Sequence, residues 1–75
     1  MAQRARYRTK QIRRDMAARG LDRKWLGQAT GFSRTSLSNF FAGFQTVRVG
    51  AAISRALGHE PGYYLIDVVD PTRAA

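Results

Sequence analysis

Apolar positions recur at helical spacing from residue 9 onward. In the first stretch Thr9 can cap a helix and Gly20 can end it, and a second stretch begins at the capping residue Asp22 and ends before Gly31. Their apolar faces consist of Ile12, Met16 and Ala17 in the first stretch and of Trp25, Leu26 and Ala29 in the second. The pattern predicts two helices, and the second is barely two turns long.

A third helix is predicted from about Arg34 to Ala42, with Ser33 as its N-cap and Gly43 at its end. Large apolar residues recur there at i, i+3, i+4 and i+7, namely Leu37, Phe40, Phe41 and Phe44. Because Ser33 follows Gly31 by only two residues, the second and third helices are joined by a tight turn.

The C-terminal third predicts a fourth helix from Val47 to Leu57, which Gly58 ends. Glu60 and Pro61 are typical of a first helical turn, so we expect a short fifth helix over residues 62–66, although residues 65–69 are also compatible with a strand. Residues 1–8 lack an apolar period and are expected to form a flexible basic arm, and residues 67–75 a tail. The expected fold is all-α, with five helices over residues 9–66.

Charge is distributed unevenly along this pattern. Thirteen Lys and Arg against five Asp and Glu give a formal net charge of +8. Residues 1–34 contain ten of the basic side chains and only two acidic ones, whereas basic and acidic residues balance in 35–75. Such segregation exceeds what solubility requires and favours a polyanion, above all nucleic acid, as partner.

Several function classes are excluded by size and composition. Seventy-five residues provide one small core and no second domain to form a substrate cleft. With no Cys, a single His to which we assign no role, and five scattered carboxylates, we expect no catalytic site, metal, cofactor or small-molecule ligand. No apolar run approaches the roughly 20 residues of a membrane span, and the N-terminus lacks a secretory pattern, which favours a soluble cytoplasmic protein.

Two short helices joined by a three-residue turn form the frame of a helix-turn-helix. Gly27 supplies the small side chain where the helices cross, and Gly31 tolerates the positive φ of the turn. The positions that must be buried to fix the crossing angle are Leu26, Phe32, Leu37 and Phe40.

The segment from Ile12 to Leu65 resembles the DNA-binding domain of the lambda-type repressor and Cro family of phage and bacterial regulators. The matching stretches are IRRDMAARGL, RKWLGQATGFSRTSLSNFFAG and AISRALGHEPGYYL. The resemblance implies a compact five-helix domain whose third helix lies in the major groove of double-stranded DNA. It also implies a transcriptional regulator, commonly a repressor that binds a palindromic operator as a homodimer in the bacterial cytoplasm.

The outer face of the third helix carries the candidate base contacts. With Leu37 and Phe40 turned inward, the opposite face presents Arg34, Thr35, Ser38 and Asn39. Arg can donate two hydrogen bonds to guanine, Asn can pair with adenine, and Thr or Ser can contact either kind of base. A plain solvated face would more typically carry pairs of Glu and Lys.

Candidate phosphate contacts surround that face. The resemblance implies that Arg23 and Ser33 contact phosphates. The family's Lys after the third helix is missing here, which leaves Gln45, Thr46 and Arg48 as substitutes. In the expected arm, Arg4, Arg6 and Arg8 can follow a phosphate strand or enter the minor groove.

Two other classes of function remain open. A basic RNA-binding protein would need aromatic side chains for stacking, and the candidates are Tyr7, Trp25 and the Phe residues near the end of the third helix. An antitoxin or excision-type partner would contact another protein through Trp25 and Phe44, which, with Phe41, are otherwise additional core. Residues 65–69 can pair with a second copy as an edge strand or close the core.

Overall fold

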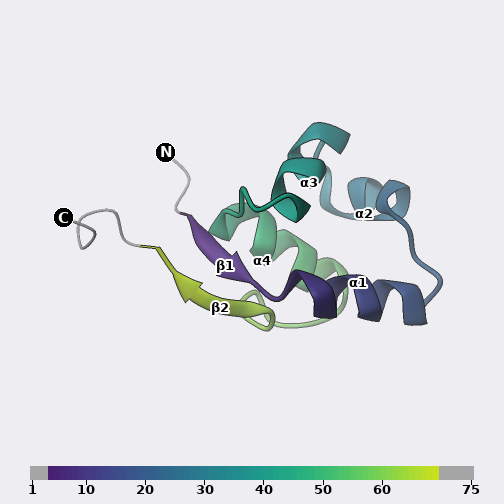
Figure 1. Ribbon diagram of the computed structural model, residues 1–75. Coiled ribbons are helices and arrows are strands. Elements are labelled where there is room, and N and C mark those ends of the chain that lie inside the picture. Colours follow the sequence, from purple (N-terminus) through teal and green to yellow (C-terminus); the bar gives the residue numbers. More distant parts are fainter. Residues whose placement is uncertain (1–3, 70–75) are drawn as a thin grey trace.

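Four short helices and a two-stranded sheet make up residues 4–69, the part of the chain that the computed structural model describes (Figure 1). The order is β1 (Ala5–Tyr7), α1 (Thr9–Ala18), α2 (Arg23–Thr30), α3 (Arg34–Phe41), α4 (Val47–Ala56) and β2 (Leu65–Val68). The helices α2 and α3 lie together on one side, and the two strands lie side by side at the end of the molecule remote from α2 (Figure 1).

The helices lie where the apolar periodicity predicts them, and side-chain caps start three of them. Asp22 accepts a hydrogen bond from the backbone N–H of Trp25, Ser33 from Ser36 and Thr46 from Val49, at 2.8, 3.1 and 3.4 Å. The expected cap of the first helix is wrong, because Thr9 is its first helical residue and Arg8 stands at the N-cap, where its side chain makes no capping hydrogen bond.

The prediction of an all-α fold with a fifth helix is wrong. Residues 61–64 form a turn and the chain continues into β2, which pairs with β1 in antiparallel orientation. The β-branched residues Ile66, Val68 and Val69 favour extended backbone, and β1 offers them hydrogen-bonding partners that a one-turn helix would lack. Between Leu57 and Leu65 the core receives one fully buried side chain, Tyr64.

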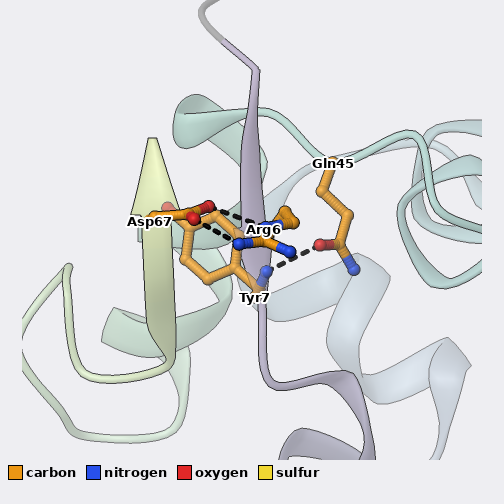
Figure 2. Close-up of polar contacts among 4 residues, drawn as sticks. All are labelled: Arg6, Tyr7, Gln45 and Asp67. Atoms are coloured by element: carbon orange, nitrogen blue, oxygen red, sulfur yellow. Dashed lines mark hydrogen bonds and ion pairs between the residues drawn. The ribbon is translucent and has the colours of Figure 1, made fainter. Parts of the chain in front are cut away.

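The prediction of a flexible arm is wrong for residues 4–8. In β1, Ala5 and Tyr7 are each 5% exposed and belong to the core, while the residues between and beside them face outward. Ala5 pairs with Val68 and Arg6 with Asp67, whose side chains also form an ion pair (Figure 2). Of the expected tail, Asp67 and Val68 lie in β2, and residues 1–3 and 70–75 lie outside the described part of the chain.

The core joins this sheet to all four helices. Its buried side chains are Ala5, Tyr7, Ile12, Met16, Leu26, Leu37, Phe40, Ile53, Leu57 and Tyr64. Tyr7 packs against Phe40 of α3 with ring centroids 5.5 Å apart. The hydroxyl of Tyr64 donates to Asp15 of α1 at 2.6 Å, which links the turn before β2 to the first helix. Through Tyr7, the sheet therefore packs against the buried face of α3.

Candidate nucleic-acid interface

A tight turn fixes α3 against α2, as the sequence predicts. Gly31 ends α2 with a left-handed φ of 77°, and its N–H donates to the carbonyl of Gly27 at 2.9 Å. Ser33 then caps α3, so the turn contains only residues 31–33. Because both ends of the turn are hydrogen-bonded, α3 has little freedom to rotate about the connection.

The helices α2 and α3 approach each other closely at Gly27, where a Cβ would already be in van der Waals contact. A Cβ placed on Gly27 would lie 3.4 Å from the carbonyl oxygen of Phe32 and 3.7 Å from Cδ1 of Leu37. Leu26, Leu37 and Phe40 are at most 1% exposed, as expected for the residues that set the crossing angle. Phe32 is only partly buried. The two helices thus pack as a close pair with a shared apolar interior.

The outward face of α3 presents most of the predicted base-contacting side chains to solvent. Arg34, Thr35 and Asn39 are exposed. Ser38 is half-buried, and its hydroxyl accepts a 3.2 Å hydrogen bond from Nη1 of Arg23. The structure therefore keeps three of the four candidates free and gives the fourth a partner from α2.

Arg23 and Ser33, the two phosphate contacts that the resemblance implies, both lie beside this face. The guanidinium carbon of Arg23 stands 4.6 Å from the ring centroid of Phe41, at the end of α3. The Ser33 hydroxyl accepts from the Ser36 N–H and donates to the Ser36 hydroxyl, both at 3.1 Å. Arg23 keeps donors free for a ligand, whereas Ser33 is mainly occupied as a cap.

A surface hollow of about 590 Å³ lies between the start of α2 and the start of α3. Three cations line it, Arg23, Lys24 and Arg34, together with Asp22, Gly27, Gln28 and Leu37. No phosphate contact is predicted for Lys24 from the sequence, although its position next to Arg23 in the first turn of α2 indicates one. The hollow extends from α2 to the exposed face of α3, and its lining is mainly positively charged.

The three candidates after α3 have different environments. Gln45 is 8% exposed, and its side chain bonds the N–H of Tyr7 and the carbonyl of Phe40, so it faces inward (Figure 2). Thr46 is the N-cap of α4. Arg48 is exposed, with its guanidinium carbon 5.5 Å from the ring centroid of Phe32. Of this group, Arg48 alone offers an exposed side chain.

The three N-terminal arginines are held by the fold. Arg4 lies over the ring of Phe44 at 4.4 Å, and Phe44 itself is 67% exposed. Arg6 pairs with Asp67, which raises the pKa of the guanidinium and lowers that of the carboxyl, chiefly through their hydrogen bond. Arg8 donates to the carbonyl of Leu65 at 3.2 Å. These cations accompany the sheet rather than reaching out on an arm.

The candidate interface carries mainly positive charge. Within residues 4–69 a single ion pair forms, Arg6 with Asp67, at the end of the molecule remote from α2. The cations of α1, α2 and α3 in this part of the chain have no carboxylate within ion-pairing distance. Arg23, Lys24 and Arg34, which line one hollow, therefore remain available to an external anion and lie close enough together to attract a polyanion.

Other kinds of site find little support among the described residues. Over residues 4–69, no three His, Cys, Asp or Glu side chains gather where they would hold a metal ion. The same residues include no helix with the length and apolar character needed to cross a membrane. Comparison of the chain with protein-family models, curated proteins and solved structures gave no match.

Proposed function

We propose that this protein binds double-stranded DNA sequence-specifically and regulates transcription, as a repressor of the Cro type, with α3 in the major groove. The observation that carries the proposal is the contrast between the two faces of α3. Leu37 and Phe40 are 1% and 0% exposed, whereas Arg34, Thr35 and Asn39 on the opposite face are open to solvent.

The chemistry of that face suits base edges. The major groove is about 12 Å wide and admits one helix, and each base pair presents a distinct set of donors and acceptors there. Arg34 can donate a fork of two hydrogen bonds to guanine, and Asn39 can pair with adenine through its amide. Thr35 adds a methyl group that can contact thymine. A helix held by a tight turn brings these groups to the bases in one orientation.

The surrounding charge supports a duplex as the ligand. The whole excess of +8 arises from residues 1–34, which include α1, α2 and the start of α3. Phosphate contacts from such cations supply a large part of the affinity of DNA-binding proteins and fix their register. Arg23, Lys24 and Arg34 line the hollow between α2 and α3, and their charge suits the phosphates of a strand that flanks the groove.

Selection from a random duplex library at about 0.15 M salt tests the proposal, because nonspecific phosphate binding is weak under those conditions. We expect enrichment of a short motif. Half-sites about one helical turn apart would indicate a homodimer on a palindrome, and one isolated half-site a monomeric reader. Absence of any enriched sequence would contradict specific DNA binding. Tighter binding to RNA, or capture of a stoichiometric protein partner, would then identify one of the other two classes.

Two substitutions separate base contacts from phosphate contacts. Asn39→Ala should flatten the preference at one position of the motif and leave the other positions unchanged. Arg23→Gln should weaken binding to all sequences alike and reduce the salt slope by about one unit. Gln11→Ala, which removes an exposed amide from α1, is the matched control for Asn39. If Asn39→Ala kept the full motif, Asn39 would not contact a base.

A further inference from the structure

Two arginines from different helices share one aromatic ring. The guanidinium carbon of Arg13, on α1, lies 5.2 Å from the ring centroid of Phe41, and that of Arg23, on α2, lies 4.6 Å from it. The two guanidinium carbons are therefore within about 10 Å of each other, close to one Debye length at about 0.1 M salt. Phe41, the last residue of α3, thus brings two like charges together.

The same residues line a hollow of about 250 Å³. Its walls include Arg13, Arg23, Phe41 and Asp22, and the apolar side chain of Leu21. Asp22 is the one carboxylate of the hollow, and its Oδ1 accepts the N–H of Trp25 at 2.8 Å as the cap of α2. Neither arginine has a carboxylate within ion-pairing distance among the described residues.

Stacking on an aromatic face orients a guanidinium without using its N–H donors. Arg23 uses one donor on Ser38, and the rest of its fork is free. Holding two cations together costs Coulomb energy that an anion between them would offset. The planar fork of Arg matches the oxygens of a phosphate group, which accept two parallel hydrogen bonds.

We propose that Arg13 and Arg23, oriented by Phe41, form a binding site for one phosphate group of the DNA backbone. The inference rests on the proposed function and adds Arg13 as a ligand-binding residue and Phe41 as a positioning residue. The site adjoins the hollow between α2 and α3, since Asp22 and Arg23 line both. A strand flanking the major groove can therefore follow the cations from Arg13 to Arg34 while α3 contacts the bases.

The test measures the affinity of Arg13→Gln for a duplex of random sequence between about 50 and about 200 mM salt. Loss of one phosphate contact should lower the slope of log affinity against log salt by about 0.9. The matched control is Arg14→Gln, which removes the same charge from the next position of α1. Arg14 lines a different hollow, with Tyr7 and Ile66, and its loss should leave the slope near that of the wild type.

The random duplex makes this test independent of base reading. A reduced slope in Arg13→Gln alone supports the site even if the library selection finds no motif. Equal slopes for Arg13→Gln and Arg14→Gln overturn the site, and leave specific recognition by α3 untouched. Titration with inorganic phosphate, followed through the Arg13 Nε–H resonance, shows whether the site binds free phosphate or the DNA backbone. If free phosphate saturates the site while Arg13→Gln leaves duplex binding unchanged, the proposal is overturned.

Phe41 is tested through its aromatic face. Phe41→Leu keeps an apolar side chain but removes the aromatic ring over which both guanidinium groups lie, so the salt slope should fall as in Arg13→Gln. Phe41→Tyr keeps the ring and should retain the wild-type slope. A melting curve for each variant confirms that the fold is intact. An unchanged slope in a folded Phe41→Leu protein would overturn the positioning role.

Discussion

The backbone N–H of Tyr7 donates a 2.7 Å hydrogen bond to Oε1 of Gln45, which connects β1 to the segment that follows α3 (Figure 2). The Gln45 amide also donates from Nε2 to the carbonyl of Phe40 at 3.3 Å, and its backbone carbonyl accepts the N–H of Ala5 at 3.0 Å. One buried amide therefore joins the N-terminal strand to the C-terminal end of the helix that carries the candidate base contacts.

Gln45→Ala should destabilise the fold by about 1 to 3 kcal/mol, because it leaves the buried N–H of Tyr7 without its acceptor. Urea unfolding measures the free energy of unfolding directly. Gln11→Ala, at an exposed position of α1, should change it by less than about 0.5 kcal/mol. Equal stability of the two variants would show that water replaces Gln45 without cost.

Gly50→Ala is expected to destabilise the protein, although alanine favours helices by about 1 kcal/mol over glycine. A Cβ at Gly50, in α4, would lie 2.1 Å from Cζ of Tyr7, a core residue of β1 that is 5% exposed. Crowding of this kind typically costs about 1 to 3 kcal/mol. Thermal melting of Gly50→Ala should therefore occur at a lower temperature than that of the wild type.

The background variant Tyr7→Ala supplies the control for this clash. Without the ring, adding Gly50→Ala should raise the melting temperature, because only the helix preference of alanine remains. If Gly50→Ala destabilised both backgrounds equally, the Tyr7 ring would not be the reason for glycine in α4.

The helical part of this fold is predictable because its signals are local. Asp22 and Ser33 cap their helices within three residues, and Gly31 ends α2 through its own φ. The exposure of Arg34 and Asn39 follows from the same short-range periodicity that buries Leu37. The arrangement of α2 and α3 at the candidate site could therefore be predicted from the sequence.

The sheet could not be predicted from the sequence, because its two strands are the first and the last elements of the fold. Three residues of β1 and four of β2 carry too little pattern separately, and each strand needs the other for its hydrogen bonds. Residues 5–7 do alternate as a strand requires, with Ala5 and Tyr7 facing inward and Arg6 facing outward. The charge of Arg6 nevertheless favours the prediction of a flexible arm. The burial of Gln45 and the shared ring of Phe41 likewise depend on contacts between distant segments.

Tyr64→Phe should lower stability at neutral pH and reduce the loss of stability in alkali. Tyr64 is fully buried, and burial, followed by its hydrogen bond to Asp15, raises the pKa of the phenol above the ordinary value of 10.0. A raised pKa stabilises the fold below the ordinary pKa, and that contribution disappears as the pH rises above it. Loss of a hydrogen bond to a carboxylate should cost about 1.5 to 3 kcal/mol at about pH 7.

Urea unfolding at about pH 7 and about pH 11 checks both halves of this prediction. The difference in stability between wild type and Tyr64→Phe should narrow at the higher pH, where the phenol ionises in the unfolded wild-type chain while the fold keeps it protonated. Burial also raises the pKa of Tyr7, but Tyr7 is present in both proteins, so its contribution cancels from the comparison. A constant difference at both pH values would show that the pKa of Tyr64 is the same in the folded and the unfolded protein.

Asp22→Asn should strengthen binding to any duplex without weakening the fold. The Asp22 side chain caps α2, and it lines both hollows beside Arg23, where its charge opposes a phosphate. Asn caps helices about as well as Asp, so the substitution removes the charge and keeps the acceptor. A unit charge about 7 Å from a phosphate in water is worth roughly 0.6 kcal/mol, which corresponds to about a threefold gain in affinity.

Asp22→Ala removes the same charge but also the cap, and should lose about 1 kcal/mol of stability. Fluorescence anisotropy on a random-sequence duplex, with a melting curve for each variant, measures both effects; no gain in affinity for Asp22→Asn would show that the phosphates pass elsewhere.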